Sequence, residues 1–265
     1  MIKKITFKTK VLQYNITGSG MPVIFIHGFG EDSTIWHNQV SYLENFFTVL
    51  SIDLPGTGGS NMIDKEIIDI SDLAEAIHEV VKFEKIIHFV MIGHSLGGYV
   101  SLEYQKKYPN ELVGLGLFHS TANSDSEEKK TIRKKSISFI RKNGAISFLE
   151  TTIPGLFHDF KESTAIDCIM KGIKQHRDIV LIQYYEAMMN RPSSIELLKS
   201  LTIPLLLVGG KYDEIIPLKE TLRQSHLSRQ THFHILQHSA HMGMIEEIEE
   251  SNTILRVFLE YLWSN

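Results

Sequence analysis

Several features that mark specialised classes of protein are scarce or missing in this chain. Its 265 residues hold one cysteine, Cys168, so no disulfide can form within the chain. Lysine and arginine number 27 against 31 aspartates and glutamates, and the net charge of −4 excludes a whole-molecule basic field for nucleic acid or anionic lipid. No apolar run approaches the roughly 20 residues that cross a bilayer. With 43% hydrophobic and 22% charged residues, the composition is that of a globular protein.

The same absences bear on the compartment and on the ligands. The first residues, MIKKITFKTKVLQYNI, lack the apolar centre of a secretory signal, so we expect a cytoplasmic protein. The sequence has no CxxC motif and no spaced group of cysteines and histidines that would indicate a zinc site. We therefore expect no metal and no other cofactor. We also expect no nucleic-acid partner and no membrane partner.

Strand-like and helical patterns alternate over both ends of the chain. Short apolar or β-branched runs are typical of strands, and longer runs with one apolar face are typical of helices. This alternation predicts an α/β fold with a mostly parallel sheet flanked by helices. The predicted strands are 4–7, 11–15, 22–26, 48–52, 86–92, 112–118, 203–208 and 231–236, the first two forming a hairpin. The predicted helices are 34–43, 73–83, 96–108, 218–226 and 244–262.

The middle of the chain has a different pattern. Between residues 120 and 200 the pattern is helical and polar with no clear strand, and it predicts helices over 125–143, 166–174 and 178–189. A segment of this length is too long for a loop. We therefore predict an inserted all-helical cap, or lid, over 120–200, and a core built from 1–119 and 201–265.

The sharpest motif runs from Gly93 through Ser95 to Gly97, between a predicted strand and a predicted helix. A G-x-S-x-G sequence in that context places the serine on a tight turn that pushes its hydroxyl toward solvent. The two glycines fit because side chains two residues from the serine would collide across the turn. The helix that follows directs its free N–H groups at developing negative charge. Ser95 is therefore a candidate nucleophile.

A serine hydroxyl needs a histidine base that is oriented by a carboxylate. Asp213 follows the predicted strand 203–208, at the edge where open α/β sheets place their chemistry. His241 follows the predicted strand 231–236. Glu214, beside Asp213, and His238, three residues before His241, are alternatives that the spacing leaves open.

Four motifs in this order make the chain resemble the α/β-hydrolases with a helical cap, a family of serine hydrolases that includes carboxylesterases. The resemblance covers nearly all of the chain outside the cap, and it favours Asp213 as the acid and His241 as the base. The motifs are His27-Gly28-Phe29-Gly30, Asp53-Leu54-Pro55-Gly56-Thr57-Gly58-Gly59-Ser60, the Ser95 turn, and the segments that hold Asp213 and His241.

The resemblance also implies roles for other residues. The backbone N–H groups of Phe29 and Leu96 would form an oxyanion hole, and His27 and Asp53 would have structural roles. His94 and His119 are expected to line the substrate site. The activity implied is hydrolysis of a small carboxylic ester or related acyl substrate through an acyl-enzyme.

Two other activities fit the same motifs: a carbon–carbon bond hydrolase or enol-lactonase, and a small-molecule receptor that retains the triad. The cap also carries a basic run whose members share helical faces by the i,i+4 rule. We expect this run to be either a solvated helix face or a docking strip for an acidic carrier, such as an acyl carrier protein. The run consists of Lys129, Lys130, Arg133, Lys134 and Lys135.

Overall fold

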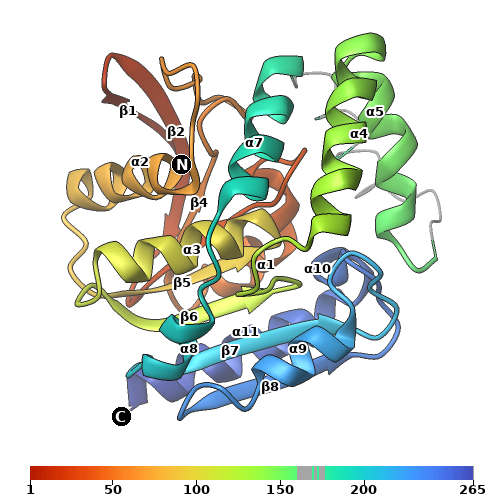
Figure 1. The fold of residues 1–265 in the computed structure, drawn as a ribbon. Coiled ribbons are helices and arrows are strands. Elements are labelled where there is room, and N and C mark those ends of the chain that lie inside the picture. The colour runs from red at the N-terminus through yellow and green to blue at the C-terminus, as the bar shows by residue number, and fades with distance from the viewer. Residues whose placement is uncertain (160–168, 170–171, 173–176, 265) are drawn as a thin grey trace.

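The computed structural model describes residues 1–159, 169, 172 and 177–264 (Figure 1). In this part of the chain eight strands form one sheet, in the order β1-β2-β4-β3-β5-β6-β7-β8. Strand β2 runs antiparallel to both of its neighbours, and the other pairs are parallel. The predicted fold class is therefore confirmed. The strands are β1 (Ile2–Phe7), β2 (Lys10–Gly18), β3 (Pro22–Ile26), β4 (Thr48–Ile52), β5 (Phe89–His94), β6 (Leu112–Phe118), β7 (Leu205–Gly210) and β8 (Thr231–Leu236).

The strand predictions give the exact bounds of four of the eight strands. The bounds of β3, β4, β6 and β8 are those expected, and β1 and β2 form the predicted hairpin. Strand β5 was expected from Ile86, but it begins at Phe89. Ile87 is 73% exposed and follows a turn at Lys85 with φ 56°, so this apolar residue lies outside the sheet. All residues of β5 are buried, as in a strand covered on both faces.

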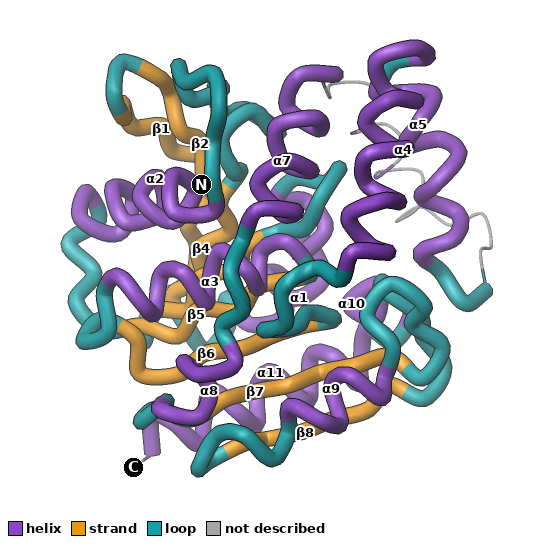
Figure 2. Tube along the Cα trace, in the orientation of Figure 1, coloured by secondary structure: helices purple, strands orange, loops and turns teal. Residues whose placement is uncertain are grey.

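Helices cover both faces of the sheet (Figure 2). Helix α2 packs against α3, and α1 packs against α11. The predicted last helix is divided in two, because Glu247 has the non-helical angles φ −129° and ψ 66°. No helix of the described residues is long and apolar enough to cross a membrane. The core helices are η1 (Ser33–Trp36), α1 (His37–Leu43), α2 (Ile70–Phe83), α3 (Leu96–Lys107), α8 (Ile195–Ser200), α9 (Leu218–Gln224), α10 (Gly243–Glu246) and α11 (Ile248–Ser264).

The described part of the predicted cap consists of helices. Helix α4 packs against both α5 and α7, and Figure 1 shows the three grouped beside the sheet. Helix α8 lies with the sheet instead, so the chain returns to the core directly after α7 rather than at residue 200. The helix expected over 166–174 lies outside the described residues, apart from Ile169 and Gly172. The cap elements are α4 (Glu127–Asn143), α5 (Ala145–Thr152), η2 (Ile153–Leu156) and α7 (Asp178–Asn190).

A buried ion cluster joins the two connections between core and cap. Asp125, on the connection into α4, accepts from Arg133 Nε at 2.5 Å and from Arg191 Nη1 at 2.8 Å. Arg191 follows α7 and also donates to the carbonyl of Asn123 at 2.8 Å. Burial would raise the pKa of Asp125, but its bonds with the two arginines outweigh burial and lower that pKa. One carboxylate therefore binds both guanidinium groups and balances one of their two charges.

We expect Asp125→Ala to lower the free energy of unfolding by about 3–5 kcal/mol, because it leaves buried guanidinium groups without their anion. Urea denaturation at pH 7 measures this loss. The matched control is Glu196→Ala, which removes the exposed partner of Lys199 and should change stability by less than about 0.5 kcal/mol. Equal stabilities of the two variants would contradict the structural role of the cluster.

Candidate active site

Ser95 stands at the turn between β5 and α3, in a backbone conformation that residues other than glycine rarely adopt, with φ 49° and ψ −112°. A Cβ on Gly93 would lie 2.2 Å from the Gly97 carbonyl oxygen, and a Cβ on Gly97 would lie 2.3 Å from that of Ile26. Neither position can hold a side chain. The structure therefore supplies the strand–turn–helix context that the G-x-S-x-G motif requires.

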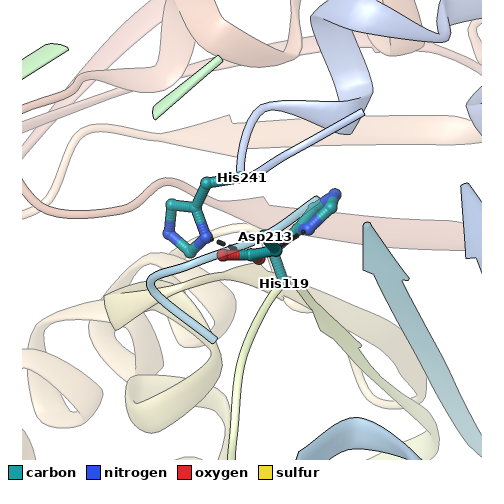
Figure 3. A group of neighbouring side chains, drawn as sticks. All are labelled: His119, Asp213 and His241. Atoms are coloured by element: carbon teal, nitrogen blue, oxygen red, sulfur yellow. Dashed lines mark hydrogen bonds and ion pairs between the residues drawn. The ribbon is translucent and has the colours of Figure 1, made fainter. Parts of the chain in front are cut away.

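The carboxylate of Asp213, which follows β7, is surrounded by hydrogen-bond donors. Oδ1 accepts from the amides of Ile215 and Ile216, each at 2.9 Å. Oδ2 accepts from His241 Nδ1 at 2.8 Å and from His119 Nδ1 at 3.1 Å (Figure 3). Burial would raise the pKa of Asp213, but the two histidines outweigh burial and hold that pKa well below its usual range. The carboxylate is therefore charged at neutral pH.

The two alternative residues lie outside this network. Glu214 and His238 are exposed, whereas Asp213 and His241 are buried. The His238 amide donates to Glu247 at 2.9 Å, which ties the loop before His241 to the start of α11. The structure thus brings Asp213 and His241 together and leaves the neighbours of each at the surface.

His119 is a second histidine on Asp213, at the carboxyl end of β6. The ring is fully buried, and its Nε2 accepts from the Gly243 amide at 3.2 Å, which fixes its proton on Nδ1. Burial lowers the pKa of His119 to about 4, so the ring is neutral. The expectation that His119 contacts substrate is corrected, because both ring nitrogens are engaged with protein groups. The sequence signal for this role is its place after β6, next to the strand that carries the acid.

This depressed pKa predicts a pH dependence of stability. A histidine that stays neutral when folded is protonated on unfolding below pH 6.5, so its contribution to stability is lost as the pH falls from 6.5 to about 4. We expect the loss to be on the order of 3 kcal/mol. His119→Asn, which keeps a donor and tolerates the positive φ of 49°, should lack this loss. Urea denaturation from pH 7 to pH 4.5 measures it, with exposed His238→Asn as the control. Parallel curves for wild type and His119→Asn would contradict the assignment.

Among the described residues, one group has the residue types and spacing of a metal site. It consists of His119, Asp213 and His241, and one ligand atom from each lies within 4.8 Å of the others. The bond from Gly243 places a proton on His119 Nδ1, which makes that atom a donor to the carboxylate. The arrangement is thus a hydrogen-bond network centred on a carboxylate.

His94, immediately before Ser95, is likewise fully buried. Its Nδ1 contacts Glu31 Oε2 at 3.0 Å, and its Nε2 contacts the carbonyl oxygen of His241 at 2.9 Å. Both ring nitrogens therefore meet protein groups, which corrects the expectation that His94 lines the substrate site. The contact with His241 fixes the loop after β8 directly beside the Ser95 turn.

The candidate oxyanion residues lie on the same edge of the sheet. Phe29 is in the turn after β3, where the amide of Gly28 donates to Glu31 at 2.6 Å. Leu96 is the first residue of α3, whose first N–H groups have no acceptor within the helix. His27 and Asp53 hold neighbouring loops, as expected: His27 Nε2 accepts from the Leu54 amide at 3.0 Å, and Asp53 accepts from the amides of Ser33 and Gly59.

The cap contacts the loops at this edge. The carbonyl of Leu156 in η2 accepts from the His241 amide at 2.9 Å. In α7, Tyr184 donates to the Pro55 carbonyl at 2.8 Å, and the Tyr185 ring stacks on Phe29 with ring centres 4.1 Å apart. The cap therefore covers the loops that follow β3, β4 and β8, which hold Phe29, Asp53 and His241.

Comparison with known proteins agrees with this architecture. A family profile described as the alpha/beta hydrolase family matches residues 23–251. The chain belongs to the α/β-hydrolase family. It is a hydrolase of that superfamily, and the predicted family is confirmed.

Relatives of this α/β-hydrolase include esterases. It is 27% identical over 220 residues to a pimeloyl-[acyl-carrier protein] methyl ester esterase of Wigglesworthia glossinidia brevipalpis, covering 78% of this chain and 80% of the relative. A thermophilic esterase from Thermogutta terrifontis has a similar structure, with 28% identity, a TM-score of 0.88 and 99% of each chain covered. An enol-lactonase from Burkholderia xenovorans LB400 shares the fold at 18% identity, with a TM-score of 0.88 over 97% of this chain and 99% of its own.

Proposed function

We propose that this protein is a serine hydrolase of small carboxylic esters or related acyl compounds. The observation that carries the proposal is the bond from His241 Nδ1 to the charged, buried Asp213. It leaves Nε2 as the basic nitrogen of His241, on a loop that His94 holds beside the Ser95 turn. A histidine fixed in this tautomer beside a serine on a strand-to-helix turn is suited to nucleophilic catalysis.

The proposed reaction runs through an acyl-enzyme. Ser95 Oγ attacks the substrate carbonyl while His241 accepts the serine proton, which it later gives to the leaving alcohol. Asp213 stabilises the imidazolium that forms. The amides of Phe29 and Leu96 donate to the oxyanion, an arrangement in which removal of one donor typically costs about 3 kcal/mol. Water activated by His241 then releases the acid and restores Ser95.

A series of p-nitrophenyl esters with acyl chains of increasing length tests this proposal. We expect multiple turnover with at least one short or medium chain. A single stoichiometric burst would instead indicate a receptor that retains the triad. If no p-nitrophenol were released but an enol-lactone or a carbon–carbon substrate were turned over, the protein would instead be an enol-lactonase or a carbon–carbon bond hydrolase.

Fewer residues of the basic run in α4 are exposed and unpaired than the sequence predicts. Arg133 is turned toward Asp125 and lies 5.3 Å from the centre of the Tyr185 ring, so it does not belong to an exposed strip. Lys130 pairs with Glu127 at 2.8 Å. Lys134 and Lys135 remain exposed.

We propose Lys134 and Lys135 as the contact for an acidic carrier, with support from the printed activity of the relative that acts on a carrier-bound ester. Reversing both charges to glutamate should slow hydrolysis of an ester on acyl carrier protein several-fold at low salt, because electrostatic steering raises the encounter rate. Hydrolysis of neutral p-nitrophenyl butyrate should stay within about twofold, since surface changes rarely reach the chemistry. Steady-state kinetics at low and high salt compare the two substrates. If hydrolysis of the carrier-bound ester were unchanged at low salt, the two lysines would have no docking role and would be part of an ordinary solvent-exposed helix face.

A further inference from the structure

The two hydrogen bonds of His94 require one proton on Nε2 and a second proton between Nδ1 and Glu31 Oε2. Its Nε2 meets the carbonyl oxygen of His241, which can only accept. Its Nδ1 meets Glu31 Oε2, an oxygen that already accepts the Gly28 amide at 2.6 Å. A neutral imidazole has one N–H and can donate only once. His94 can donate in both contacts at once only when its ring is an imidazolium, with Glu31 as a carboxylate that accepts.

The surroundings favour this charged pair. The side chains of His94 and Glu31 are only 1% and 4% exposed, so solvent screens their attraction little. Burial would lower the pKa of His94 and raise that of Glu31, but their mutual attraction and hydrogen bond outweigh burial and reverse both directions. The other charged or titratable groups that face the pair are the carboxylate of Asp213 and the rings of His27, His119 and His241.

The pair lies where three catalytic segments meet. Glu31 holds the amide of Gly28 in the oxyanion turn, His94 precedes Ser95, and the carbonyl of His241 belongs to the candidate base. A Cβ on Gly28 would lie 2.8 Å from both Glu31 Oε2 and His94 Nδ1, so the turn is packed directly on the pair. Loss of either ring proton removes one of these connections.

We propose that buried His94 and Glu31 form an ion pair that positions the oxyanion turn and the His241 loop relative to Ser95. This inference rests on the proposed function, because it concerns the alignment of those residues. Both are positioning residues, since neither faces substrate. As His94 loses a proton at alkaline pH, one of its two bonds is lost and kcat/KM falls.

The protonation state is tested without any turnover. In protein with ¹⁵N-labelled histidine, long-range ¹H–¹⁵N spectra at pH 7.5 should show both ring nitrogens of His94 protonated. The signals are assigned among the 13 histidines by their loss in His94→Gln, or by proximity to the Gly28 protons if that variant does not fold. A His94 ring with a single protonated nitrogen would overturn the proposal, even if the proposed hydrolase activity is correct.

Glu31→Gln tests the positioning role. Glutamine keeps the size and an acceptor oxygen, but it removes the charge that holds His94 protonated. We expect the alkaline limb of kcat/KM to move to lower pH by at least about one unit, which is a tenfold change in the protonation equilibrium. Glu196→Gln, at an exposed pair with Lys199, should keep the wild-type profile. A wild-type profile in Glu31→Gln would refute the positioning role. If the wild type hydrolyses no ester, the proposed function fails while the nitrogen signals still decide the protonation state.

Discussion

Ser95→Ala is expected to lower kcat on p-nitrophenyl esters by about 10⁴–10⁶-fold, because the covalent route is lost while the binding site and oxyanion donors remain. The fold should persist. Alanine retains a Cβ, so the unusual backbone angles of residue 95 impose a similar strain before and after the substitution. Single-turnover and steady-state kinetics measure the loss, and thermal unfolding confirms that the variant is folded.

The matched control is Ser138→Ala, on the exposed side of α4, where the hydroxyl bonds only to the Lys134 carbonyl among the described contacts. Its activity should stay within about twofold of wild type. If Ser95→Ala retained a tenth or more of the wild-type rate, Ser95 could not be the nucleophile.

The second large effect concerns the base. His241→Ala should reduce kcat/KM by about 10⁴-fold or more, since no other group takes the serine proton. Initial rates in buffers of constant ionic strength measure this loss.

His238→Ala is the control, because His238 is exposed and three residues away on the same loop. We expect it to keep at least half of the wild-type activity and the same pH profile. A large loss in His238→Ala together with a small one in His241→Ala would mean that the wrong histidine has been assigned.

The sequence predicts the fold well where local pattern and burial agree. Strands β3, β4 and β6 have the expected bounds because each is almost entirely buried and therefore has a run of mostly apolar residues. The bounds of β8 are also those expected, although most of its residues are only half-buried. The pattern fails at Ile87, which is apolar but exposed, and at Glu247, where the backbone breaks the last helix. At both positions the surrounding tertiary structure decides, and a local pattern does not contain that information.

The same limit applies to the site. Motif order brings Asp213 and His241 to the correct edge, because the carboxyl ends of parallel strands meet there. Position along the chain does not reveal how deeply a side chain is buried, so His94 and His119 were expected to contact substrate, although both are fully buried. Arg133 was expected at the surface because its partner, Asp125, lies eight residues away and is itself held by Arg191 from the other connection of the cap.

The most direct measurement is identification of the residue that a fluorophosphonate probe modifies. Such probes react with serine hydroxyls that a neighbouring base activates. We predict one adduct per chain in the intact mass, located by peptide mapping on Ser95, and none in Ser95→Ala or His241→Ala. An adduct on another residue, or an active enzyme that the probe leaves unmodified, would contradict a serine mechanism centred on Ser95.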